Sequence, residues 1–175
     1  MLVVTRDKAK VLCVINSVIT SKNNENSVAN RARTAARLAA VQAVYQMYMT
    51  DETPEKVVEE FVKYRLPVRD ENFSVGVPNI SLFRELALGT AKEIKLIDCL
   101  INEVLVEGWS SERLESTLHA ILRVASYELK YHTITPSAVV ISEYIDVTHA
   151  FYDDKAVGLV NGVLDTISKK SWENS

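Results

Sequence analysis

Apolar side chains recur every three to four positions along most of this chain, the spacing that places them on one face of an α-helix. The pattern predicts helices at residues 31–49, 54–64, 81–106, 116–131, 136–150 and 154–169. No alternation of apolar and polar residues, which would indicate β-strands, stands out against it. We therefore expect an all-α fold.

Residues that favour helix starts stand at several of these boundaries. Thr53 and Thr135 are each followed by proline, a pair typical of an N-cap and the first helical position. Asn30 is a candidate cap for the first helix. Residues 65–78 contain two prolines and a glycine, so we expect a loop there.

The first 29 residues differ from the rest of the chain. They end in a polar stretch at 21–27, which is typical of a linker, so we place the folded domain at 30–175. Residues 1–29 are then a disordered extension or the product of a misassigned start codon. The apolar run at 11–19 is too short to cross a bilayer. Basic residues before it keep a signal peptide open as the alternative, but without a clear cleavage site we expect a cytoplasmic protein.

Composition and charge exclude several classes of function. Of the 175 residues, 47% are hydrophobic, enough for a core that needs no metal or disulfide. The net charge of −3 argues against indiscriminate binding to nucleic acid, so any such contact must come from a local basic cluster. Cys13 and Cys99 lack zinc-site spacing and are expected to be reduced thiols.

No common catalytic signature is present, because the chain has no glycine-rich phosphate loop, no HExxH and no GxSxG. His149 follows Asp146 by three residues, and we favour a solvated or capping histidine over a base or a ligand. Asp153 and Asp154 resemble a metal-binding pair, but their carboxylates also suit the positive end of a helix that starts there. We expect no catalysis, no cofactor and no metal.

An arginine cluster is the remaining chemical feature. Arg31, Arg33 and Arg37 fall in the first turns of the first predicted helix. Guanidinium groups bind phosphate in a bidentate manner and stack on unpaired bases, chemistry that suits single-stranded RNA. From composition alone, a solvated charged face is the slightly favoured interpretation.

Four segments resemble the NusB family, in the family's order. The first runs from Arg33 to Tyr45 and closes in Gln-Ala-Val-Tyr. The second, at 121–129, contains Leu-Arg followed by Tyr-Glu-Leu. The third comprises Pro136 and residues 139–143, and the fourth, at 159–165, reads Leu-Val-Asn-Gly-Val-Leu-Asp. Together they are spread, in family order, over residues 31–170.

The resemblance implies a NusB-like bundle of about seven helices in two packed halves. It further implies a transcription antitermination factor without catalytic activity. Such a factor binds the boxA element of ribosomal RNA leaders together with NusE, a small-subunit ribosomal protein, and keeps RNA polymerase from terminating early. A homodimer is also possible on this resemblance.

The same resemblance assigns roles to individual residues. Arg33 and Arg37 match arginines that face RNA, and Arg31 belongs to their cluster. Lys155 is a further candidate RNA contact, although the family often has an acid there. Tyr45 matches a tyrosine near the surface that binds the ribosomal protein, with a core tyrosine as the alternative.

Other positions depart from the family or are interpreted as structural. Thr34 and Ala35 stand where further arginines are common, which predicts weaker RNA binding. Leu118 replaces an acid that contacts the partner in some members. Four positions are interpreted as structural, with a helical glycine permitting close packing and a buried amide or acid needing partners: Tyr127, Glu128, Asn161 and Gly162.

Two alternatives stay open. One is a helical protein-interaction scaffold without RNA binding, which the acidic balance favours. The other is a stand-alone relative of the NusB-like domain that is fused to ribosomal RNA cytosine methyltransferases. Binding of boxA RNA with and without the ribosomal protein would discriminate among them.

Overall fold

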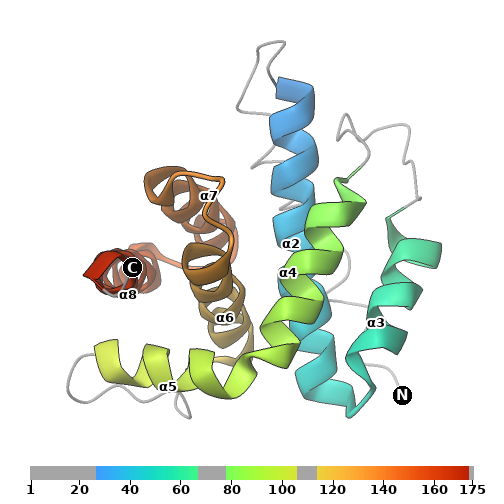
Figure 1. Ribbon diagram of the computed structural model, residues 1–175, viewed down its shortest axis with the longest axis horizontal. Coiled ribbons are helices and arrows are strands. Elements are labelled where there is room, and N and C mark those ends of the chain that lie inside the picture. Colours follow the sequence, from blue (N-terminus) through green and yellow to red (C-terminus); the bar gives the residue numbers. More distant parts are fainter. Residues whose placement is uncertain (1–26, 67–77, 106–113, 174–175) are drawn as a thin grey trace.

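The protein is a bundle of α-helices (Figure 1). The computed structural model describes residues 27–66, 78–105 and 114–173. These residues contain no β-strand, which confirms the expected fold class. The helices are α2 (Ser27–Thr50), α3 (Pro54–Glu60), the π-helical turn η1 (Phe61–Arg65), α4 (Ile80–Lys92), α5 (Ile94–Val104), α6 (Ser116–Tyr131), α7 (Ser137–His149) and α8 (Asp154–Glu173).

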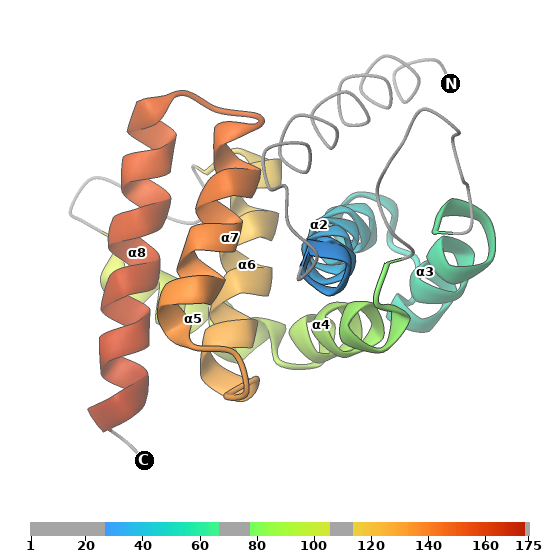
Figure 2. The ribbon, with the colours of Figure 1, turned by 90° about the horizontal axis from the view of Figure 1, so that it is seen from above.

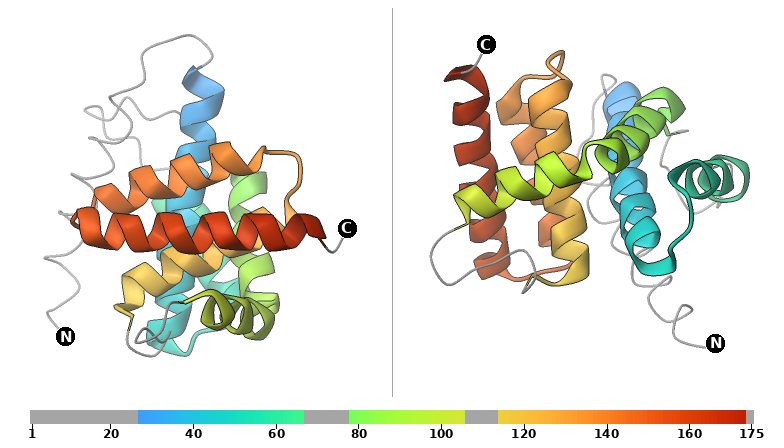
Figure 3. Two further views of the ribbon diagram at one scale, coloured as in Figure 1. Left: turned by 90° about the vertical axis from the view of Figure 1, so that its left-hand side faces the viewer. Right: turned by 60° about the horizontal axis from the view of Figure 1, so that its bottom comes forward.

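The helices form two packed halves, as the family resemblance implies. Figure 2 shows α2, α3 and α4 on one side and α6, α7 and α8 on the other. Helix α8 lies along α7, and α5 extends from α4 to reach α6 and α8 (Figure 3). Helix α2 packs against both α4 and α6, so it joins the two halves.

A continuous hydrophobic core supports this arrangement. Its fully buried side chains include Phe83 and Leu86 on α4, Ile121 and Leu122 on α6, and Leu164 on α8. Each such side chain contributes roughly 1.5–3 kcal/mol by leaving water. The core therefore fixes the positions of the helices that carry the candidate site.

The predicted helix at 81–106 was wrong in one respect, because the structure divides it at Glu93. This residue has φ −97° and ψ 12°, outside the helical region, and it separates α4 from α5. The two pieces have different partners: α4 packs against α2, α3 and α6, whereas α5 packs against α6 and α8. With neither proline nor glycine at the break, the periodicity gave no signal of it.

Several helix ends also differ from expectation. Helix α2 begins at Ser27, so Asn30 lies inside it and is not its cap. The Thr53 cap is confirmed, since its hydroxyl accepts a hydrogen bond from the Lys56 amide at 3.4 Å. Helix α7 has no side-chain cap, so the expected Thr135 cap is wrong. The Asp153 carboxylate accepts from the Ala156 amide at 3.2 Å, which supports its assigned place at a helix start.

The expected arm at 1–29 lies almost wholly outside the described residues, as do the apolar run at 11–19 and Cys13. Among the helices that the structure describes, none has both the length and the apolar character needed to cross a lipid bilayer.

Candidate nucleic-acid interface

The first turns of α2 present two of the three predicted arginines toward solvent. Arg33 is exposed, and its Nη1 donates a long hydrogen bond of 3.4 Å to Oδ1 of Asn30, one turn earlier. Arg31 is partly exposed. Between them, the Ala32 carbonyl accepts a hydrogen bond of 3.0 Å from the backbone amide of Asn79, just before α4. This hydrogen bond therefore anchors the turn of α2 that carries both arginines to the segment just before α4.

Arg37 does not belong to this exposed face, and its predicted exposure was wrong. Its side chain is buried, and its residue exposure is 2%. Its Nη2 lies 2.6 Å from Oε1 of Glu128, and its Nε donates to both oxygens of the same carboxylate at 3.0 and 3.1 Å. A guanidinium engaged in this way has little left to offer a phosphate.

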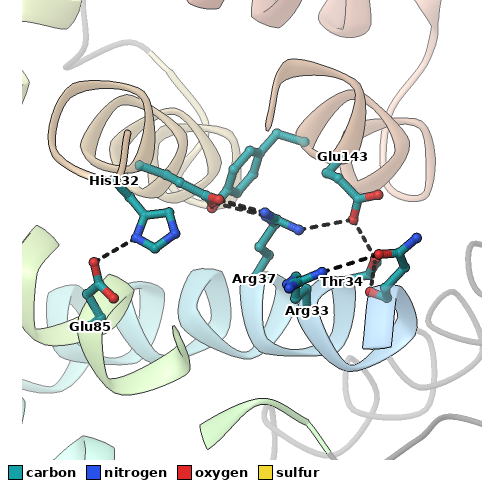
Figure 4. Close-up of polar contacts among 9 residues, drawn as sticks. Arg33, Thr34, Arg37, Glu85, His132 and Glu143 are labelled. Carbon is teal, nitrogen blue, oxygen red and sulfur yellow. Dashed lines mark hydrogen bonds and ion pairs between the residues drawn. The ribbon is translucent and has the colours of Figure 1, made fainter. Parts of the chain in front are cut away.

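Helix α7 completes the buried cluster around Arg37 (Figure 4). Oε2 of Glu143 lies 3.4 Å from Nη1 of Arg37 and accepts a hydrogen bond from the hydroxyl of Thr34. The hydroxyl of Tyr144 donates to Oε2 of Glu128 at 2.8 Å. We call these five residues, Thr34, Arg37, Glu128, Glu143 and Tyr144, the buried polar cluster.

The electrostatics of this cluster keep its donors protonated. Burial alone would lower the pKa of Arg37, but the hydrogen bonds and negative charge of Glu128 outweigh burial and raise the pKa. Burial, reinforced by the charge of Glu128, raises the pKa of Tyr144 well above its ordinary value. Removing any one partner would leave a charged or polar group uncompensated in the core.

Two residues of the fourth family-like segment, Asn161 and Gly162, lie on the surface of α8, and so does Lys155 before that segment. Lys155 is exposed in the first turn of α8, a helix that packs mainly on α5, α6 and α7. Asn161 and Gly162 are exposed too, and a Cβ at Gly162 or at Gly158 would meet open space. The structural interpretation of Asn161 and Gly162 was therefore wrong, because among the described residues Asn161 is exposed and nothing lies within 4 Å of a Cβ added at Gly162.

The structural interpretation of Glu128 and Tyr127 is confirmed. Glu128 is fully buried in the polar cluster. The ring of Tyr127 occupies the space where a Cβ on Gly89 would lie. Gly89 thus permits close approach of α4 and α6, a role that the sequence analysis assigned to the wrong glycine.

Tyr45, the predicted partner contact, is half-buried against the core, and the exposed Tyr48 lies one turn later. The guanidinium of Arg123 on α6 lies 5.2 Å from the centre of the Tyr48 ring. Asp98 on α5 holds Arg123 through two hydrogen bonds of 2.7 Å. The sequence analysis missed this polar and aromatic patch, because it treated Arg123 only as part of a hydrophobic helix.

The described residues contain no group of three or more His, Cys, Asp or Glu side chains that could hold a metal ion. His149 is exposed at the end of α7.

Comparisons with known proteins place the chain in a family. Residues 34–169 match the NusB family. A transcription antitermination protein NusB from Nitrobacter hamburgensis is 40% identical over 149 residues, which cover 85% of this chain and 92% of the relative.

Solved structures agree with this. A NusB structure from T. maritima superimposes with a TM-score of 0.64 at 30% identity, covering 81% of this chain and 96% of that one. A structure of the antitermination factors NusB and NusE in complex with double-stranded RNA shares the fold, with a TM-score of 0.67, 24% identity, and coverage of 80% and 98%. From the sequence match and the shared fold together, the chain belongs to the NusB family.

Proposed function

We propose that this protein is a transcription antitermination factor that binds single-stranded, boxA-type RNA jointly with the small-subunit ribosomal protein NusE. The proposal is supported by its membership of the NusB family and by the function that the name of its Nitrobacter relative states. That name describes no enzyme activity, in agreement with the expectation that the protein catalyses no reaction.

The observation that carries the RNA-binding part is the pair Arg31 and Arg33 at the start of α2. Arg33 is exposed, and the backbone beside both residues is anchored to Asn79. An ordered backbone lowers the entropy cost of placing guanidinium groups on phosphates. Lys155 is a second, separate candidate for binding RNA, because its ammonium group is exposed on α8.

For the partner, we propose the surface around Tyr45 and Tyr48. An exposed tyrosine offers a protein partner a large apolar surface with a polar end. Arg123, held by Asp98, adds a charged group beside it. This surface lies at the end of α2, whereas the arginines lie at its start, so the same helix would present RNA and partner sites.

With one exposed and one partly exposed arginine at the start of α2 and a net charge of −3, the chain alone should bind RNA weakly. The basic surface of a ribosomal protein would raise the affinity. The complex would act on the transcribing RNA polymerase, in the cytoplasm, and a homodimer of the free protein is compatible with this scheme.

The experiment is to titrate labelled boxA RNA with the protein, with NusE, and with both, and to follow fluorescence anisotropy. We expect the mixture to bind at least about tenfold more tightly than either protein alone, a coupling within the usual allosteric range. If the mixture binds RNA no more tightly than NusE alone, while the two proteins still associate, the chain is an interaction scaffold and the RNA-binding proposal fails.

A further inference from the structure

The buried polar cluster lies beside the candidate RNA-binding turns of α2. Its five residues come from three helices: Thr34 and Arg37 from α2, Glu128 from α6, and Glu143 and Tyr144 from α7. Figure 4 shows Thr34 and Arg37 on one side of α2, with Arg37 directed between α6 and α7 and Arg33 next to Thr34. The cluster therefore connects the candidate RNA-binding turns with the second half of the molecule.

Helical geometry places Arg31 and Arg33 on either side of this connection. With 3.6 residues in each turn, Thr34 and Arg37 share one face of α2, and Arg31 and Arg33 lie on the two flanks of that face. A rotation of α2 about its axis would thus turn one arginine toward the protein and the other away from it. The direction of both guanidinium groups depends on what prevents this rotation.

Two contacts oppose the rotation near the arginines. On the α7 side, the Thr34 hydroxyl donates to Oε2 of Glu143, which also lies 3.4 Å from Nη1 of Arg37. On the α4 side, the Ala32 carbonyl accepts from the Asn79 amide. Arg33 lies in sequence between Ala32 and Thr34, the two anchored residues.

We propose that Thr34 and Glu143 are positioning residues of the RNA-binding face, which fix the rotation of α2 so that Arg31 and Arg33 both reach the same RNA. This inference rests on the proposed function. Thr34 stands where a further arginine is common in the family. Its hydroxyl binds no phosphate in this scheme and instead orients Arg31 and Arg33.

Charge supplies a sharp test. Glu143 is a carboxylate close to arginines that are to bind a polyanion, so simple electrostatics predicts that Glu143→Gln, which changes the net charge from −3 to −2, tightens RNA binding. A positioning role predicts the opposite sign. Glu59→Gln removes the same charge from an exposed residue on α3 that pairs with Arg84, and is the matched control.

The first experiment measures RNA affinity of the complex with NusE for Thr34→Val, which removes the hydroxyl but keeps size and charge, and for Thr34→Ser, which restores the hydroxyl. We expect Thr34→Val to weaken binding about three- to tenfold, the range by which packed networks modulate a distant site. Thr34→Ser should recover most of the affinity. Glu143→Gln should weaken binding by a similar factor, whereas Glu59→Gln should leave it unchanged or slightly tighter.

A stability control separates positioning from general destabilisation. Ile167→Val trims a fully buried side chain of α8 and should lower the melting temperature without changing RNA affinity. Hydrogen exchange should be faster at the amides of residues 31–37 in Thr34→Val, but not in Ile167→Val.

The outcomes are distinct. If the parent complex gains no RNA affinity from the chain, the proposed function fails, and this inference fails with it. If the parent contributes to binding but Thr34→Val matches it, or Glu143→Gln binds as tightly as Glu59→Gln, the positioning role alone is overturned.

Discussion

The guanidinium of Arg37 on α2 forms a two-pronged pair with the carboxylate of Glu128 on α6, 91 positions later in the chain, with Nη2 and Oε1 2.6 Å apart. Both side chains are almost completely buried. The pair joins the two halves of the molecule at the interface between α2 and α6. Glu143 from α7 joins them, so three of the family-like segments meet in one buried cluster.

This relationship predicts different losses of stability for two arginines that are four residues apart. Arg37→Ala leaves the carboxylate of Glu128 without its cation and should destabilise the fold by about 3–5 kcal/mol. Arg33→Ala, an exposed change, should alter stability by no more than about 0.5 kcal/mol. Urea unfolding of the two variants provides the measurement. Equal losses would show that Arg37 is as solvated as Arg33.

Two helical glycines should respond in opposite directions to alanine. Gly89→Ala places a methyl group in the space of the Tyr127 ring and should cost about 1–3 kcal/mol, despite the better helix propensity of alanine. Gly162→Ala meets open space and should stabilise α8 by up to about 1 kcal/mol. Thermal unfolding compares them directly. A stabilised Gly89→Ala variant would contradict the close approach of α4 and α6.

Acid should weaken the packing of α5 against α6. Partial burial raises the pKa of Asp98, but hydrogen bonds from Arg123 and His119 outweigh burial and lower it from 3.8 to about 2. Because the folded-state pKa lies below the unfolded value, this stabilisation is present above about pH 4 and is lost as the pH falls toward 2.

The measurement is the difference in unfolding free energy between the parent and Asp98→Asn. We expect a gap of about 1–2 kcal/mol at pH 6, since partial exposure screens the pair, and a smaller gap at pH 3. A gap that does not change with pH would show that the charge of Asp98 contributes nothing to stability.

The local pattern of apolar residues was sufficient to predict most of the helices. The predicted bounds of the helix at 116–131 match α6, because its apolar positions and its ends are both encoded nearby in sequence. The division at Glu93 was not predictable in this way. It depends on which partner each piece packs against, and periodicity carries no information about partners.

The candidate site shows the same limit. Arginine in the first turns of a helix is usually solvated. The acids that pair with Arg37 in the core lie 91 and 106 positions away in the sequence. Nothing within α2 distinguishes Arg37 from Arg33. The prediction for Asn161 and Gly162 failed in the opposite direction, because both were expected to be packed and both are exposed. A glycine in a helix indicates close packing only where another helix covers it.

The central claim is that the start of α2 contacts RNA phosphates. Its most direct measurement is the salt dependence of boxA RNA binding by the complex with NusE, for the parent, for Arg33→Ala and for Lys92→Ala. Lys92 has a side chain that is 82% exposed, at the far end of α4, and serves as the charge control. We expect Arg33→Ala to weaken binding and to lower the slope of log affinity against log salt by about 0.7, the value for one phosphate contact on a single strand. Lys92→Ala should change neither the affinity nor the slope. An Arg33→Ala variant that folds normally and retains the affinity and slope of the parent would contradict the account.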